Sequence, residues 1–233
     1  MKTVHLIFLS CLLLCSLSAL SQEKVPPIRF LSLGTTPLNT LDPITGTLET
    51  VLELKPHSNL SGELKYGRKI EFLERILSNN ISNKNHREWK MGIKYFLGAF
   101  KGSIDSTNFI ASINPFIGIE HFRVNHQYEN SNSWLVRDGV DYRYDSSDVN
   151  RKVRGFRFRL GVAYTIDRHW GVEVYAGLGI KRINISHNTV NERREDRLLR
   201  RVVFIGPDDK KEGRLQKFDF ILGFKLDYRL FTW

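Results

Sequence analysis

The chain has 233 residues, a formal net charge of +10 and 41% hydrophobic residues, which is enough for one domain of moderate size. Its two cysteines, Cys11 and Cys15, both lie within the first 21 residues. Residues 22–233 therefore cannot form disulfides, and thiol catalysis and cysteine-ligated metal are excluded there.

The first 21 residues have the layout of a cleavable secretory signal. Lys2 precedes an apolar run at about 4–14, and the small residues Ala19 and Ser21 stand where a signal peptidase would cut. The alternative is a membrane anchor, but the apolar run is short for a spanning helix. We therefore expect an exported protein, with one domain at 22–233.

The charge of the exported domain favours a lipid partner. Removing the signal removes only Lys2 from the charge count, which leaves a net charge of +9. An exported protein rarely meets nucleic acid, so anionic outer-membrane lipid or lipopolysaccharide is the expected counter-charge. After the signal no run approaches 18 apolar residues. This excludes helical membrane spans but leaves alternating strand spans open.

Alternation of apolar and polar residues predicts eight β-strands. In chain order they are expected at about 27–35, 47–55, 59–67, 89–98, 109–124, 153–166, 170–185 and 216–231. The fifth is less clear, because Pro115 cannot donate a ladder hydrogen bond. The last is the clearest, since every second residue from Phe218 to Leu230 is apolar and most of the residues between them are polar.

The connections between these strands alternate in length, at roughly 11, 3, 21, 10, 28, 3 and 30 residues. In an up-and-down barrel such alternation places all the long loops on one rim, as in outer-membrane barrels. The polar, turn-rich segment 125–152 is expected to be a loop. Within the third connection, the apolar spacing in 70–77 predicts a short amphipathic helix that caps its own loop rather than binding a membrane or a partner.

The polar faces of the strands carry acids and bases in nearly equal numbers. A solvated outer face would tolerate this mixture, as in a soluble, exported, lipocalin-like carrier whose apolar faces turn inward. The interior of an eight-stranded barrel, however, is just wide enough to be filled by side chains, so opposite charges could pair there while the apolar faces meet lipid. We therefore predict a lumen charge network formed by Glu49, Glu53, Glu63, Lys65, Lys90, Lys94, Glu120, Arg157, Arg159, Glu173, Lys181, Asp219, Lys225, Asp227 and Arg229.

Aromatic residues fall near both ends of the predicted strands. Tyr164, Trp170 and Tyr228 lie near the short turns, and Phe156 and Phe218 lie near the opposite ends. Two such bands are typical of the girdles that mark the two interfaces of a membrane.

In these features the chain resembles the small eight-stranded outer-membrane barrels of the OmpA and OmpX kind from Gram-negative bacteria. The resemblance implies an all-β, antiparallel, up-and-down transmembrane barrel in the cell outer membrane. It also implies a monomer without enzymatic activity or cofactor, serving a structural or surface-interaction role.

In that group the last strand closes the barrel and ends in an aromatic residue read by the barrel-assembly machinery. This implies that Phe231 and Trp233 form the assembly signal. The apolar parity of the last strand shifts from even to odd numbers after Leu230, which predicts a bulge or the end of pairing at 230–231.

The candidates for chemistry in this sequence are weak. Ser186 and His187, with Glu192 nearby, are closest to a hydrolytic site, but adjacent residues of a strand point to opposite faces and would not converge. His121 and His126 come closest to a metal-ligand spacing, and we expect no metal there. The alternatives to a non-enzymatic barrel remain a lipid-modifying outer-membrane barrel enzyme and the soluble carrier.

The connection before the last strand is rich in arginine. Its simplest interpretation is a solvated loop, and the alternative is contact with lipopolysaccharide phosphates or an acidic partner. The residues concerned are Arg193, Arg194, Arg197, Arg200 and Arg201.

Overall fold

The computed structural model describes residues 29–37, 47–69, 81–98, 100–103, 110–167, 169–195 and 210–232. Its strands are β1 (Phe30–Thr35), β2 (Thr47–Lys55), β3 (Leu60–Lys69), β4 (Ile81–Phe96), β5 (Phe100–Ser103), β6 (Ile110–Arg137), β7 (Val140–Thr165), β8 (Trp170–Val190), β9 (Arg193–Glu195) and β10 (Gly213–Thr232). Across these ranges, no helix is both long and apolar enough to cross a membrane.

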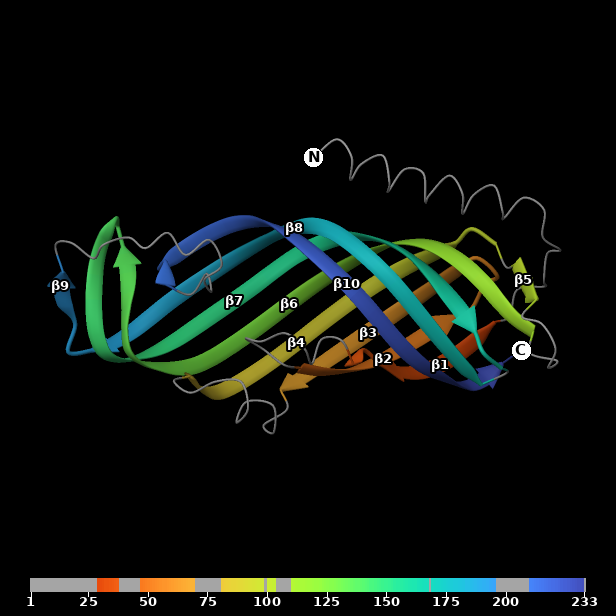
Figure 1. The fold of residues 1–233 in the computed structure, drawn as a ribbon, viewed down its shortest axis with the longest axis horizontal. Helices are drawn as coiled ribbons and strands as arrows, with labels where there is room; N and C mark the ends of the chain where they lie inside the picture. The colour runs from red at the N-terminus through yellow and green to blue at the C-terminus, as the bar shows by residue number, and fades with distance from the viewer. Residues whose placement is uncertain are drawn as a thin grey trace.

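Eight of the described strands close into a ring, which confirms the predicted all-β antiparallel barrel (Figure 1). The ring runs β1–β2–β3–β4–β6–β7–β8–β10, and β10 pairs back onto β1. All of these pairings are antiparallel. The two short strands were not predicted: β5 pairs with β6, and β9 pairs with β7.

The barrel wall turns its apolar side chains outward and its charged side chains inward. Strand β2 alternates buried and exposed residues along its whole length. Leu52 is 44% exposed, whereas the adjacent Glu53 is completely buried. The same alternation places Phe158 outside and Arg159 inside on β7. This orientation is the reverse of the one that a soluble carrier barrel needs.

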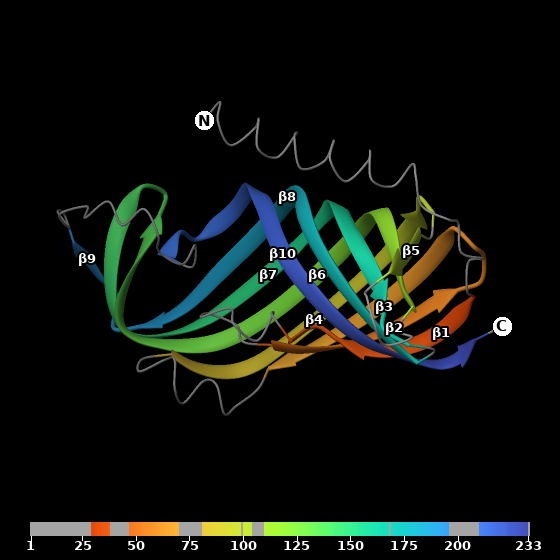
Figure 2. The same cartoon turned by 45° about the vertical axis from the view of Figure 1, so that its right-hand side comes forward.

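The prediction of a loop at 125–152 was wrong, because β6 and β7 continue through this segment as one long hairpin. Their pairing runs from Ser112–Thr165 to Arg137–Val140. A two-residue turn joins them, with Asp138 and Gly139 at φ angles of 52° and 81°. Two-residue hairpin turns with positive φ at both positions match the right-handed twist of the strands, and Asp-Gly is a favoured sequence for them. Figures 1 and 2 show this hairpin at one end of the barrel, with β9 beside it.

Along β7 the apolar residues change from the outer to the inner face of the barrel, which explains why part of this strand was predicted to be a loop. Toward the short-turn end the apolar residues of β7 have even numbers and are exposed, as in Phe156 and Phe158. Farther along the strand from the short turns, at Val149 and Val153, they have odd numbers and are buried. The strand therefore loses its alternation at the crossover, although its backbone pairing continues. Strands β4 and β8 likewise extend beyond their predicted ends, to Ile81 and Val190.

The predicted irregularity in the last strand is confirmed as a bulge. Leu31 pairs with Phe231 and Ser32 pairs with Arg229, so Leu230 is the extra residue on β10. With this extra residue, β1 and β10 stay paired on both sides of the change in apolar parity. The predicted signal at 1–21 and the predicted helix at 70–77 lie outside the described residues.

Candidate functional site

The interior of the barrel holds a chain of ion pairs, beginning with two lysines toward the short-turn end. Lys94 Nζ lies 2.7 Å from Glu53 Oε1 and 2.6 Å from Glu173 Oε1. Lys225 Nζ contacts the same two acids, at 2.8 Å from Glu173 Oε1, and lies 3.5 Å from Asp227 Oδ1. Four of these groups therefore form a closed square of alternating charge.

A second cluster surrounds Arg159, which is completely buried. Its guanidinium contacts Glu63 and lies 3.2 Å from Glu120 Oε2. Lys65 Nζ bridges the same acids, at 3.2 Å from Glu63 and 2.9 Å from Glu120. Lys94 Nζ also lies 3.4 Å from Glu63 Oε2. This contact links the second cluster to the first.

The third cluster lies toward the end of the barrel that carries the long β6–β7 hairpin. Lys90 contacts Glu49 and lies 3.0 Å from Glu88 Oε1. Arg157 Nε lies 3.1 Å from Asp219 Oδ2 and 3.6 Å from Glu120 Oε1. The second of these contacts joins Arg157 to the Arg159 cluster.

The structure places all fifteen predicted lumen residues on the inward face. Lys181, the most open of them, lies 3.0 Å from Asp219 Oδ1. Arg229 donates to Thr165 Oγ1 at 2.8 Å. Glu88 and Lys55 also face the lumen but were not predicted, although both share the inward parity of their strands. Glu88 lay just before the predicted start of its strand, and Lys55 was the last residue of the second predicted strand.

Aromatic and aliphatic side chains pack against the charges toward both ends of the lumen. Phe96, Phe116 and Tyr175 form a buried cluster toward the short turns, and Lys55 Nζ lies 4.0 Å from the centre of the Phe96 ring. At the other end Phe122 packs in a larger buried cluster, with Arg157 4.0 Å above its ring. Toward the short turns the aromatic rings are therefore interleaved with charges, since Glu173 and Lys225 lie closer to the turns than Tyr175 does. The larger hydrophobic cluster lies on the hairpin side of the charges.

The packing around the charges is tight. A Cβ atom at Gly92 would lie 2.8 Å from both Arg159 Nη2 and Glu63 Oε1, and one at Gly223 would overlap the Tyr175 ring. These glycines make room for large side chains from other strands. At these levels the lumen is filled by protein.

The carboxylates of Glu53, Glu63 and Glu173 come close enough to suggest a metal site, with oxygens within 4.8 Å of one another. Lys94 lies within ion-pair distance of all three. Their charge is therefore already balanced by ammonium groups, and the cluster fits ion-paired filling better than a cation site.

The hydrolytic candidate does not assemble. Ser186 is exposed, while His187 is partly buried and its Nδ1 lies 3.2 Å from Ser147 Oγ. Glu192 accepts hydrogen bonds from Arg137 and Thr189. Ser147, which was not a predicted candidate, is itself only 1% exposed. A lipid substrate outside the barrel cannot reach its hydroxyl.

The two candidate metal-binding histidines also lie apart. His126 is buried in the lumen, with its ring centre 5.1 Å from that of His86. His121, on the other face of β6, packs against Phe156 and contacts the Gly155 carbonyl through Nδ1 at 2.9 Å. The two side chains therefore do not converge.

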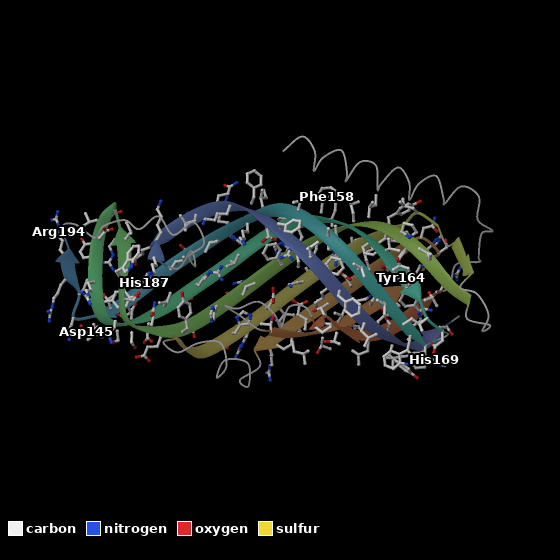
Figure 3. All side chains as sticks on the ribbon, viewed as in Figure 1. Asp145, Phe158, Tyr164, His169, His187 and Arg194 are labelled. Carbon is white, nitrogen blue, oxygen red and sulfur yellow. The ribbon has the colours of Figure 1, made fainter. Side chains whose placement is uncertain are left out.

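The turn between β7 and β8 is held by Asp167. The backbone N–H groups of Trp170 and His169 each donate to Asp167 Oδ1 at 2.6 Å. These two bonds, that of Trp170 first, hold the pKa of the Asp167 carboxyl below its ordinary value, because they favour its charged form. Figure 3 shows His169 and Tyr164 at this end of the barrel, with His187 and Arg194 at the other.

The remaining predicted site residues are only partly described. Arg193 and Arg194 are exposed on β9, while Arg197, Arg200 and Arg201 lie outside the described residues. Phe231 is exposed opposite Leu31, and Trp233 lies outside the described residues.

Comparison with known proteins identifies no family. No family model matches the chain, and no curated protein matches it. Among solved structures, the chain is similar to the crystal structure of CarO from Acinetobacter baumannii, with 12% sequence identity. The match covers 88% of this chain and 98% of that one, with a TM-score of 0.31. At this TM-score the likeness says nothing about function.

Proposed function

We propose that this protein is a non-enzymatic β-barrel of the bacterial outer membrane, with a structural or surface-interaction role and a lumen filled by its charge network. The observation that carries the proposal is the inverted wall, which is apolar outside and ion-paired inside. In water such a wall would be unstable, whereas in a bilayer both faces are satisfied.

The apolar belt runs around the whole ring. Every ring strand contributes at least one large exposed hydrophobic residue, for example Leu33, Leu52, Leu64, Ile93, Ile119, Phe158, Leu178 and Leu222. Soluble monomers rarely expose a contiguous apolar surface of this extent. Along β10 the belt runs from Phe218 to Tyr228. These ten steps of about 3.3 Å, tilted by ~40°, give a height of about 25 Å, which matches the apolar band of outer-membrane barrels.

Aromatic side chains line both edges of the belt. Near the short turns, the Trp170 and Tyr228 ring centres lie 5.1 Å apart in an edge-on contact, and Tyr95 and Tyr164 are exposed nearby. At the other edge Phe218 is 91% exposed. Two aromatic bands of this kind fit the two interfaces of a bilayer.

The filled lumen favours a structural role over transport. Because the inward charges neutralise one another at ion-pair distance, a passing ion or solute would have to break these contacts. A role at the surface suits the long β6–β7 hairpin, which extends beyond the belt.

Cell fractionation tests the proposal. We expect the protein in the outer-membrane fraction of a Gram-negative host, migrating faster on gels before heating than after heating. A periplasmic soluble protein with no heat-dependent shift would favour the lipocalin-like carrier. Refolded protein should not hydrolyse lipid, and hydrolysis abolished by Ser186→Ala would support the enzyme alternative.

Deleting residues 231–233 should impair insertion in cells far more than refolding in detergent. β10 would keep its pairing with β8, which ends at Tyr228–Trp170, so most of its hydrogen bonds and apolar surface would remain. We propose that only recognition by the assembly machinery is lost. The measurement compares the heat-modifiable fraction in outer membranes with the refolding yield for both chains. Normal insertion of the shortened chain would refute the signal assignment.

A further inference from the structure

Just beyond the apolar belt, on the side of the long hairpin, the outward face of the barrel carries two rows of basic residues. In the first row Arg123, Arg154 and Arg182 lie directly opposite one another on β6, β7 and β8. In the next row Lys152 of β7 and Arg214 of β10 are separated by one asparagine of β8. All five side chains are exposed. We refer to them as the basic rows.

The basic rows are unfavourable for the isolated protein. Residues directly opposite on antiparallel strands have Cβ atoms ~4.5–5.5 Å apart, and like charges in such pairs destabilise a sheet. In the part of the chain that the structure describes, no carboxylate lies within ion-pair distance of any of the five. Within the described residues the rows are therefore open to a neutralising charge from another molecule.

The position of the rows indicates what that molecule is. Two residues nearer the short turns, the adjacent outward row contains Phe156, Ile180 and Phe218, all strongly exposed. Two strand residues span only ~7 Å, so the guanidinium groups lie at the edge of the apolar belt. In a bilayer this is the level of the lipid headgroups.

A polar groove continues the surface on the other side of the rows. It has a volume of about 360 Å³, and its lining includes Gln127, Asp148, Asn150, Ser186 and Asn188. These five are outward positions in the next two rows of β6, β7 and β8. Amide, hydroxyl and carboxylate groups in a groove can exchange hydrogen bonds with sugar hydroxyls.

We propose that the basic rows and the groove together bind the headgroup of a phosphorylated glycolipid, the lipopolysaccharide of the outer leaflet. The arginines take its phosphates, since guanidinium groups bind phosphate through two parallel hydrogen bonds, and the groove takes its sugars. This inference rests on the proposed outer-membrane location. It assigns the contact to the barrel wall rather than to the arginines at 193–201.

The test uses the folded full-length mature protein in nanodiscs and compares two triple variants with equal loss of charge. One is Arg123→Gln/Arg154→Gln/Arg182→Gln, and the control is Arg143→Gln/Arg193→Gln/Arg194→Gln at the exposed hairpin end. We expect the first to weaken binding of lipopolysaccharide by about tenfold or more, and the control to change it less than about twofold. Equal binding by the first variant and the wild type, or an equal loss in the control, would overturn the assignment.

Two further arms identify the ligand chemistry. Dephosphorylated lipopolysaccharide should bind the wild-type protein as weakly as intact lipid binds the triple variant. Inorganic phosphate should not compete at equal phosphate concentration, and full competition would show an adventitious ion only. Asn150→Ala/Asn188→Ala should weaken binding of lipopolysaccharide more than binding of lipid A without its outer sugars. Equal weakening would overturn the role of the groove.

Stability provides an independent readout. Without lipopolysaccharide, the Arg123/Arg154/Arg182 variant should unfold at the same or a higher temperature than the wild type, because its cross-strand repulsion is gone. With lipopolysaccharide the order should reverse. A variant that is less stable under both conditions would show a purely structural role. A protein that is not found in the outer-membrane fraction would refute the proposed location. A protein that is found there but binds no lipopolysaccharide would refute only this inference.

Discussion

Replacing Arg159 with alanine will lower the free energy of unfolding in detergent by about 3–5 kcal/mol, because it leaves buried carboxylates without a partner. Arg159 is completely buried and contacts both Glu63 and Glu120. Arg157→Ala should also destabilise, since Arg157 contacts Glu120 and Asp219. Urea unfolding followed by tryptophan fluorescence measures these differences.

The control for the lumen is Arg194→Ala. Arg194 is exposed on β9, and surface changes of this kind usually alter stability by less than about 0.5 kcal/mol. If all three variants unfolded at the same urea concentration, the lumen charges would not hold the barrel together, and the assignment of inside and outside would be wrong.

Placing arginine at Leu160 or Leu222 will destabilise the barrel in a bilayer by about 2–4 kcal/mol. Both leucines are exposed near the middle of the belt, on β7 and β10. An arginine there would have to face hydrocarbon or distort the bilayer around it. Unfolding from lipid vesicles measures the cost.

The matched control introduces the same side chain outside the belt. Asn188→Arg lies on the outward face of β8, toward its end at Val190. It should change stability much less, because its environment is aqueous. Leu160→Arg and Leu222→Arg variants that folded into vesicles as stably as the parent would show that the belt does not contact lipid.

The sequence predicts the barrel wherever alternation is continuous. The strands through Phe158, Leu178 and Leu222 were recognised because one face is uniformly apolar over their whole belt segment. The half of the β6–β7 hairpin nearer its turn was not predicted, because the alternation there does not continue on one face. There the apolar residues cross to the inner face, so a search for one continuous stripe ends at the crossover. The Asp138–Gly139 turn was the local signal that could have revealed it.

The membership of the lumen could be predicted from parity, but its pairing could not. Lys94 comes from β4, and its acids come from β2, β3 and β8, so the contacts depend on barrel closure and strand stagger. The basic rows illustrate the same limit. Arg123, Arg154 and Arg182 are far apart in the sequence, and only the register of three strands brings them into line.

The long β6–β7 hairpin and the short seam between β1 and β10 differ in a way that predicts the order of assembly. The β6–β7 pair closes from a two-residue turn, so each new hydrogen bond adds to a neighbouring one with little loss of chain entropy. The seam between β1 and β10 joins residues such as Phe30 and Thr232, from opposite ends of the described chain, through only six paired positions in β1. Because long-range contacts form slowly, we expect the hairpin to zip early and the seam to close last. Until then the unpaired edges of β1 and β10 would be the sites where a template strand could attach.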